Sequence, residues 1–315
     1  MKFYNKAEPI GSKTVVALGY FDGVHLGHRE VIEKAVRAAK QKDALSAVLT
    51  FDMSARRANG KGSGDLDTYE QRAKYMENLG LDVLVQLDFD EIADMTSERF
   101  VSDILGNSGL NAVSVCCGAD FRFGAGRSGD IDTLRELCDE LDIDVIIVSE
   151  VELDDKTVST TQIKRYIELG EIERAEAMLG HPYGFSLEVC GEKKLARKLG
   201  FPTINQRIPD HLAMPRFGVY LSRAEIEGKS FYGISNIGVR PTVSSDGSVM
   251  LETNIFDFDG DLYGRTIEVD LLSFMRDERR FENPEKLRAQ VIQDIEKAKK
   301  LMIRRMKSEA AVQKS

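Results

Sequence analysis

The stretch "TVVALGYFDGVHLGHREVIEKAVRAAKQ" (residues 14–41) decides the fold of the first half of the chain. Its apolar run at 14–18 is typical of a buried strand, and residues 28–41 place Val31, Ile32 and Val36 on one face of a helix. Between them, Gly19 and Gly23 allow the backbone to turn tightly and to approach a ligand closely. The stretch therefore predicts a strand, a turn and a helix, with a ligand site at the turn.

The turn also contains His25 and His28, half of the 4 histidines in the chain. A helix that begins near Gly27 points unpaired backbone N–H groups into the space beside the turn, and this favours an anion there. Two imidazoles one helical turn apart can donate hydrogen bonds to a phosphate and to the charge that develops during its transfer. The alternative is that both histidines only cap the turn or face solvent.

The rest of the first half alternates between the same two patterns. The expected strands cover residues 45–51, 82–87, 111–117 and 144–149, and the expected helices cover 68–80, 97–106 (capped by Ser97) and 130–141. This alternation predicts a parallel sheet with helices on both faces. Ligands of such sheets bind at the carboxyl ends of the strands, where the histidine motif lies.

The second half changes to strands that follow one another without crossover helices. The expected strands cover residues 185–190, 217–226, 231–238, 249–256 and 266–274, and a long helix is expected at 284–305. In the last strand, Ile267, Val269 and Leu271 alternate with acidic residues, which is typical of a half-buried antiparallel strand. The pattern predicts a small barrel followed by a helix.

Composition limits the class of partner and the compartment. The net charge of −9 argues against a nucleic acid or an acidic membrane surface as the main partner. No apolar stretch reaches the roughly 18 residues of a membrane span, and "MKFYNKAEPIGSK" lacks the apolar core of a signal peptide. The 4 cysteines show no CxxC spacing, so we expect reduced thiols in a cytoplasmic protein. A homo-oligomer is compatible with the sequence, which does not specify one.

Four segments of the first half resemble the FMN adenylyltransferase part of bifunctional riboflavin kinase/FAD synthetases. They are the nucleotidylyltransferase motif "GYFDGVHLGH" (19–28), "CGADFRFGAGRSGD" (117–130), "VSTTQIK" (158–164) and "IELGEIERAEAMLGHPY" (167–183). In that family FMN attacks the α-phosphorus of ATP, Mg²⁺ assists, and pyrophosphate leaves. The resemblance implies catalytic roles for His25 and His28 at the ATP phosphates. It also implies a nucleotide site that includes Gly19, Phe21, Asp22, Gly27, Asp120, Phe121, Ser159, Thr160 and Thr161.

Each of these segments has a simpler alternative, and one region departs from the family. A plain turn would account for "DFRFG", and ordinary helix capping would account for the "STT" run. Where the family has a stretch like TFxPHP, this chain has "TFDMSARRANGKGSGD" (50–65). Lys164 keeps a positive charge where the family tends to have Arg, but it loses the bidentate fork. Either Arg56 and Arg57 replace the lost contacts, or this stretch is a solvated loop.

In the second half, "LARKLGFPTIN" (195–205) resembles the riboflavin kinase signature and differs from its GFPTAN core only at Ile204. A Thr hydroxyl and an Asn amide oxygen are hard ligands that suit Mg²⁺ bound to nucleotide phosphates. Thr203 and Asn205 are two residues apart on an extended segment, so they face the same side. We expect them to hold the metal, with Gly191, Lys198 and Gly200 in the nucleotide loop. The alternative is a plain turn.

Two further segments extend this resemblance. "LETNIF" (251–256) is similar to the family strand that carries the catalytic Glu, which makes Glu252 the expected base for the riboflavin hydroxyl. "FMRDERRF" (274–281) is similar to a segment near the flavin, which implies flavin contacts by Arg276 and Phe281. Alternatively, Glu252 points to solvent from the polar face of its strand.

A weak calcium-loop pattern overlaps this region. Asp257, Asp259, Asp261 and Glu268 match EF-hand ligand positions, but Leu262 stands where Gly is needed and strands flank the loop. We predict a hairpin turn there instead.

The resemblance spans nearly the whole chain and implies an α/β protein. A Rossmann-like parallel-sheet nucleotidylyltransferase domain (1–182) precedes a small antiparallel β-barrel domain with a C-terminal helix (183–307) and a disordered tail (308–315). The expected function is phosphorylation of riboflavin to FMN and adenylylation of FMN to FAD, with riboflavin, FMN and ATP as small-molecule partners. Two alternatives are an enzyme in which only the kinase is active and a flavin-binding or regulatory protein without turnover.

Overall fold

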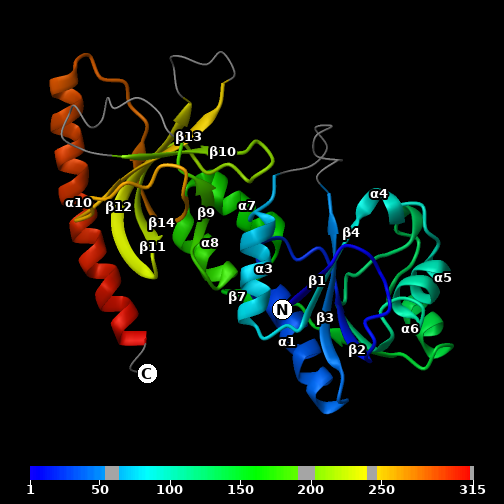
Figure 1. The fold of residues 1–315 in the computed structure, drawn as a ribbon. Coiled ribbons are helices and arrows are strands. Elements are labelled where there is room, and N and C mark those ends of the chain that lie inside the picture. Colours follow the sequence, from blue (N-terminus) through cyan, green and yellow to red (C-terminus); the bar gives the residue numbers. More distant parts are fainter. Residues whose placement is uncertain (54–63, 191–202, 240–246, 313–315) are drawn as a thin grey trace. The chain divides into compact units, whose positions relative to one another are not determined.

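The computed structural model describes residues 1–53, 64–190, 203–239 and 247–312. Contacts divide the chain into two compact units, Met1–Gly62 with Tyr69–Thr160, and Ser63–Thr68 with Thr161–Ser315. Each unit contains its own six-stranded sheet (Figure 1). Five residues with predicted roles lie outside the described residues: Arg56, Arg57, Gly191, Lys198 and Gly200.

The first unit is built on a parallel sheet with strand order β1-β4-β3-β2-β5-β6. Its strands are β1 (Lys2–Tyr4), β2 (Thr14–Leu18), β3 (Leu45–Asp52), β4 (Val83–Asp88), β5 (Ala112–Gly118) and β6 (Asp144–Val148). Every residue of the central strand β2 is buried, as its almost uniformly apolar sequence requires.

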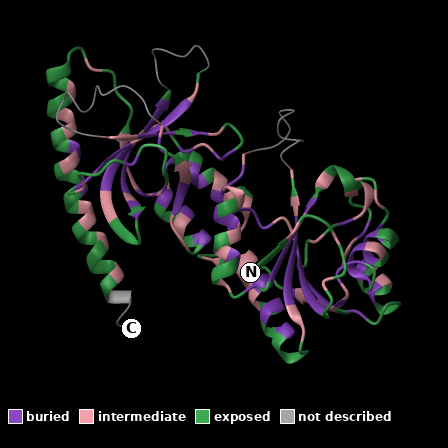
Figure 2. Cartoon of the chain, in the orientation of Figure 1, coloured by how far each residue is buried: buried purple, intermediate pink, exposed green. Residues whose placement is uncertain are grey.

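Helices cover both faces of this sheet. Ile32 of α1 (Leu26–Gln41) and Met76 of α3 (Tyr69–Asn78) pack with Val15 and Ala17 on one face. The π-helix η2 (Phe100–Leu105) and α6 (Ile131–Asp139) cover the other face. Figure 2 shows these strands buried and the helices exposed on their outer sides. The predicted parallel α/β architecture is confirmed.

Short elements complete the first unit. They are η1 (Asp22–Val24), α4 (Phe89–Ile92), α5 (Ser97–Arg99), η3 (Ala125–Arg127) and the hairpin of β7 (Glu152–Leu153) with β8 (Lys156–Thr157). The predicted cap of the helix at 97–106 is wrong. Thr96 caps it by accepting a hydrogen bond from the Arg99 N–H at 3.3 Å, while Ser97 is already helical and buried. Thr96 takes the capping role predicted for Ser97, because the hydroxyls of Ser and Thr can both accept a hydrogen bond from the first turn of a helix.

The second unit is an antiparallel sheet with strand order β10-β13-β12-β11-β14-β9. Its strands are β9 (Tyr183–Glu188), β10 (Ile204–Ile208), β11 (Gly218–Ile226), β12 (Lys229–Val239), β13 (Val249–Ile255) and β14 (Thr266–Asp277). A bridge between Val189 and Gln206 and a 2.7 Å hydrogen bond from the Cys190 N–H to the Asn205 carbonyl bring the two edges together. The sheet is therefore a nearly closed barrel, as predicted.

Among the described residues, three helices belong largely to this unit: α7 (Thr160–Leu169), α8 (Ile172–Leu179) and α10 (Pro284–Val312). Val291 and Ile295 of α10 pack on Val219 and Ile234, which lie on the outer face of the barrel. The predicted tail at 308–315 is wrong for residues 308–312, because α10 continues to Val312. An i,i+4 hydrogen bond of 2.9 Å from Arg305 to Glu309 stabilises these turns.

The segment with the calcium-loop pattern contains no hairpin. Strand β13 pairs with β10 and β12, and β14 pairs with β11 and β9, so residues 256–265 connect strands that are not neighbours. Leu262 is buried and anchors this connection. No group of three or more His, Cys, Asp or Glu suited to a metal occurs among the described residues.

Two further features of the structure concern the cysteines and the length and apolar character of the helices. All four cysteines are free, and burial raises the pKa of Cys116, Cys117 and Cys138 to about 12. Within the part of the chain that the structure describes, no helix combines the length and the apolar character needed to cross a bilayer.

Candidate active sites

The turn after β2 has a strained backbone. Phe21, Gly23 and Val24 have φ angles of 55°, 78° and 37°. A positive φ is unusual for any side chain and is an outlier for a β-branched one such as Val24. Such conformations persist where the surroundings fix them, and they cluster at functional sites. Here the Phe21 side chain is buried and meets the His28 ring edge-on at 5.3 Å between centroids.

The two predicted histidines lie against each other at the N-terminus of α1. Their rings stack with centroids 3.5 Å apart and an interplanar angle of 19°. His25 Nδ1 accepts a hydrogen bond from the His28 backbone N–H at 3.3 Å, so neutral His25 carries its proton on Nε2. His25 does cap the helix, as the simpler alternative held, and both rings also stand at an anion-favouring helix terminus.

His28 is held in its neutral form. Its Nδ1 atom is buried and has no hydrogen-bond partner among the described residues. Burial, followed by the nearby charges of His25 and Arg72, lowers the pKa of His28 well below its usual value. At neutral pH the site therefore offers an uncharged imidazole.

A buried ion pair supports this turn. The Nη2 atom of Arg72 on α3 lies 3.5 Å from Asp22 Oδ1, and both side chains are at most 5% exposed. The same guanidinium lies over the Tyr20 ring at 4.8 Å. Asp22 was predicted as a site residue, whereas Arg72 was missed. The available signal was a charged residue one helical turn before buried Met76, on the apolar side of α3.

The other predicted residues of this site lie at the same edge of the sheet. Strand β5 is a parallel neighbour of β2, so the turn after it, which holds Asp120 and Phe121, follows a carboxyl end at that edge. Asp120 is exposed, and Phe121 stacks on Phe123 at 5.8 Å.

Glycines allow the close contacts of the motif. A Cβ at Gly19 would lie 3.0 Å from the Phe21 ring, and one at Gly27 would lie 3.3 Å from the His25 ring and 3.8 Å from the Val158 carbonyl oxygen. Val158 directly precedes Ser159 and Thr160, so this last segment of the first unit approaches the histidine motif through the Val158 carbonyl. Thr161 is exposed on the first turn of that helix.

The second site is set by the register of the barrel. Asn205 on β10 pairs with Glu252 on β13, Glu252 with Asn236, Asn236 with Val219, and Val219 with Arg276 on β14. Directly paired residues point to the same face of a sheet. These five residues, which we call the outer row, therefore share the face of the barrel that α10 covers.

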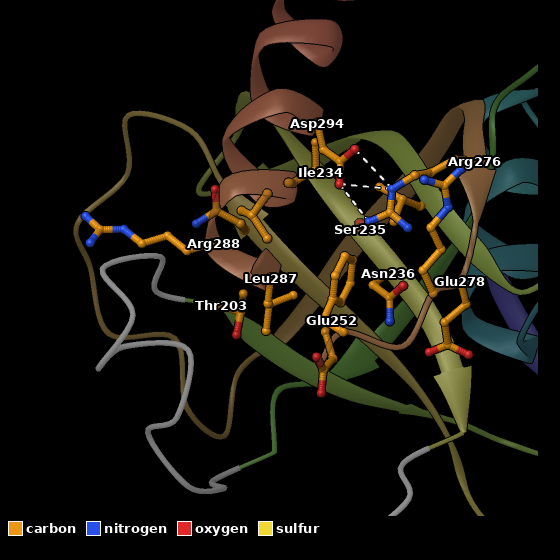
Figure 3. A pocket seen from close by; sticks show the side chains of 15 residues that line it. Thr203, Ile234, Ser235, Asn236, Glu252, Arg276, Glu278, Leu287, Arg288 and Asp294 are labelled. Carbon is orange, nitrogen blue, oxygen red and sulfur yellow. Dashed lines mark hydrogen bonds and ion pairs between the residues drawn. The ribbon is translucent and has the colours of Figure 1, made fainter. Parts of the chain in front are cut away.

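A cavity of about 320 Å³ lies between the outer row and the first turns of α10. Four predicted site residues line it together: Thr203, Glu252, Arg276 and Phe281. Figure 3 shows Thr203 and Glu252 near Leu287, and Arg276 beside Asp294. Asn205 is buried within the outer row next to Glu252. Glu252 thus faces a cavity and not open solvent.

The lining of the cavity combines polar, charged and apolar side chains. Thr203, Asn236 and Glu252 supply a hydroxyl, an amide and a carboxylate. Apolar side chains from the barrel and from α10 form an apolar surface within the lining, and they are Val219, Ile234, Leu287 and Val291. Charged side chains of β14 and α10, among them Arg276 and Asp294, line the rest. Such a cavity suits a molecule with a flat apolar part and a polar chain.

Sequence reasoning missed Asn236 and Asp294. Asn236 could have been found from the pairing of its strand with Glu252. Asp294 interrupts the apolar stripe of α10 one turn after Val291, and its buried position on that face was the signal.

The geometry defines the class of protein. One unit presents imidazoles at a helix N-terminus on the edge of a parallel sheet, and the other presents a carboxylate beside hydroxyl and amide side chains in a partly apolar cavity. Together they describe a two-domain enzyme that transfers phosphate-containing groups.

Comparison with known proteins identifies the family. A model of FAD synthetase matches residues 7–162, and a model of riboflavin kinase matches residues 179–302. The chain is 32% identical over 295 residues to the bifunctional riboflavin kinase/FMN adenylyltransferase of Bacillus subtilis (strain 168), covering 91% of this chain and 92% of the relative. It is 34% identical over 289 residues to the enzyme of the same name from Pseudomonas fluorescens, with coverages of 91% and 92%.

A solved structure described as a macrolide-efflux protein from Streptococcus pneumoniae is also similar. It has a TM-score of 0.83 and 30% identity, covering 94% of this chain and 98% of that one. The chain belongs to the family of bifunctional riboflavin kinase/FMN adenylyltransferases. It is a transferase with an N-terminal FAD synthetase domain and a C-terminal riboflavin kinase domain.

The lowered pKa of His28 predicts a pH dependence of stability. In the unfolded chain His28 binds a proton below a pH of about 6.5, while the folded protein keeps it neutral to a lower pH. The unfolded state then holds more protons, so the free energy of unfolding should fall by about 1.4 kcal/mol per pH unit below pH 6.5, until the folded pKa is reached.

Urea unfolding between pH 7.5 and 5.5 tests this expectation with the variant His28→Asn, which cannot titrate. The stability of the wild type relative to this variant should decline as the pH falls. His211→Asn, at an exposed position, is the matched control and should follow the wild type. A difference between wild type and His28→Asn that is constant with pH would contradict the assignment.

Proposed function

We propose that the kinase reaction takes place at the Asn205–Glu252–Asn236 part of the outer row. The observation that carries this proposal is the pairing of Glu252 with Asn205, which sets a carboxylate directly beside a buried amide on the neighbouring strand. The donors there are oxygen atoms of neutral side chains together with one carboxylate, and this set fits Mg²⁺. Thr203 and Asn205 would hold the ion, which when bound neutralises the phosphate charge of ATP.

Glu252 is the base of the phosphoryl transfer. The ribityl 5′-hydroxyl oxygen of riboflavin forms a bond to the γ-phosphorus of ATP, and the bond from that phosphorus to the β,γ-bridging oxygen breaks, releasing ADP. The hydroxyl proton goes to Glu252, whose position on a β-strand fixes the direction of transfer. The apolar wall and the Arg276 end of the cavity take the flavin ring, with Phe281 beside it.

The adenylyl transfer takes place at the histidine motif. A phosphate oxygen of FMN forms a bond to the α-phosphorus of ATP, and pyrophosphate leaves. His25, through its Nε2–H, and His28 donate hydrogen bonds to the ATP phosphates, and the N-terminus of α1 adds its partial positive charge. Asp120, Phe121, Ser159 and Thr160 of the same unit complete the nucleotide site.

The division between the two functions is placed near residue 182. It agrees with family matches that end at residue 162 and begin at residue 179. The reduced thiols support a cytoplasmic location for the enzyme. The net charge of −9 argues against a nucleic acid or an acidic membrane surface as its main partner.

Replacement of the base should separate the two activities. Glu252→Gln should slow FMN formation from riboflavin and ATP by about 10²-fold or more, because the hydroxyl proton loses its acceptor. FAD formation from supplied FMN should stay within about twofold of the wild type. Glu225→Gln, an exposed glutamate on the same barrel, is the control and should leave both rates unchanged. Loss of both activities in a folded Glu252→Gln protein would refute the division.

Replacement of His28 should have the reverse effect. His28→Ala should slow pyrophosphate release from FMN and ATP by about 10² to 10³, the usual effect of losing one donor to a developing charge. Riboflavin phosphorylation by the same protein should be retained, and His211→Ala should change neither rate. An unimpaired adenylyl transfer in His28→Ala would remove the histidines from the reaction.

A further inference from the structure

A buried ion pair joins α10 to the cavity. Arg276 Nη2 donates to Asp294 Oδ2 at 2.7 Å, and Arg276 Nε lies within 3.1 Å of both carboxylate oxygens. The remaining terminal nitrogen, Nη1, donates to the Asp277 carbonyl at 2.8 Å. These contacts fix the plane of the guanidinium and balance its charge, as bidentate pairs do.

The carboxylate of this pair is the more deeply enclosed partner. The side chain of Asp294 is 5% exposed and that of Arg276 is 15% exposed. Gln290, one turn earlier on α10, donates to Asp294 Oδ1 at 3.0 Å. Figure 3 shows the pair at the edge of the cavity. A carboxylate so enclosed is costly unless it has a partner, so Asp294 and Arg276 depend on each other.

The pair lies at the end of the outer row opposite the proposed metal ligands. Neighbouring strands are about 4.8 Å apart. Glu252 is one strand from Asn205 but three strands from Arg276, which corresponds to about 14 Å along the sheet. Along the outer row, the pair therefore lies at the opposite end from the proposed base, and both line the same cavity.

Asp294 also fixes one wall of the cavity. Leu287 and Val291 line the cavity from the same helix, two turns and one turn before Asp294. Holding Asp294 to β14 sets the distance between these side chains and Val219 and Ile234 on the barrel. The gap between the two apolar surfaces is where a flat ring would fit.

We propose that Asp294 is a positioning residue for riboflavin, which acts by holding Arg276 and by setting the width of the ring-binding gap beneath α10. This inference rests on the proposed placement of the metal and the base at the other end of the cavity. It assigns the ion pair to substrate binding and not to phosphoryl transfer.

Steady-state kinetics of Asp294→Asn test the inference. This substitution keeps the shape of the side chain, removes its charge and turns one acceptor into a donor that faces Arg276. The KM for riboflavin should rise by about tenfold or more, while kcat and the KM for ATP should stay within threefold of the wild type. A KM for riboflavin within twofold of the wild type would overturn the proposal, as would an equal loss in kcat.

A second pair on α10 provides the matched control. Arg305 of α10 donates to Glu176 of α8, and this pair also fastens the helix but does not line the flavin cavity. Glu176→Gln should lower the melting temperature and leave the KM for riboflavin unchanged. If it raised that KM as much as Asp294→Asn does, the effect would belong to loosening of α10 in general and the proposal would fail.

A double variant tests whether Asp294 acts on riboflavin binding through Arg276. Adding Asp294→Asn to Arg276→Met should change the KM for riboflavin by less than twofold, because the partner is already lost. An additive tenfold rise would show that Asp294 does not act through Arg276.

Should Asp294→Asn not fold, Gln290→Met removes one hydrogen bond to Asp294, and it should raise the KM for riboflavin by two- to fivefold. An unchanged KM in that variant would overturn the proposal.

Failure of this inference can be told from failure of the proposed site. Thr203→Ala should lower kcat by about 10²-fold if the metal lies at the proposed end. If Thr203→Ala behaves so while Asp294→Asn leaves the KM for riboflavin unchanged, only the positioning role is wrong. If Thr203→Ala leaves kcat unchanged, the metal placement is wrong, and with it the basis for separating the two ends of the cavity.

Discussion

The pairing of β13 between β10 and β12 is the constraint on which the proposed kinase site depends. It places Glu252 between Asn205 and Asn236 on one face of the barrel. Because side chains alternate along a strand, a shift of one residue in this register would turn Glu252 toward the barrel interior, where Leu251 and Thr253 are fully buried. The apolar interior therefore fixes the register, and the register places the polar groups. Site and core are consequences of the same pairing.

In the first unit, the position of the histidine motif depends on the turn between β2 and α1. Strand β2 is buried along its whole length, and the chain must leave it and enter α1 within a few residues. The positive φ angles of Phe21 and Val24 are the strained solution, and the Asp22–Arg72 pair and the stacked histidine rings enclose it. The same packing lowers the pKa of His28, so the strain and the electrostatics of the site have a common origin in burial.

Much of this arrangement could be predicted from the sequence, because strong apolar periodicity decides element type. The strands at 14–18 and 144–149 and the helix at 28–41 appear within two residues of their expected bounds. Strands β1 and β10 were missed, because three residues of "KFY" and the mixed "INQRI" carry little period-2 signal on their own. Their pairing partners, β4 and β13, supply what the local sequence lacks.

Prediction of the site residues from the sequence was limited in the same way, because it failed where a residue depends on a partner distant in the sequence. Motif residues such as Glu252 and His28 could be named in advance, since their chemistry is local to the motif. Arg72 and Asp294 could not, because each matters through a partner distant in sequence, Asp22 or Arg276. A charged residue on the buried side of a helix was the visible sign in both cases, and only the fold reveals what it meets.

The central claim is that one chain moves two different parts of ATP onto the same flavin at two separate sites. It is tested most directly by incubating the full chain with riboflavin, Mg²⁺ and ATP that carries a radioactive phosphorus at either the α or the γ position. The account predicts γ-label in both FMN and FAD, and α-label in FAD alone. Flavin products without γ-label, or α-label in FMN, would contradict it.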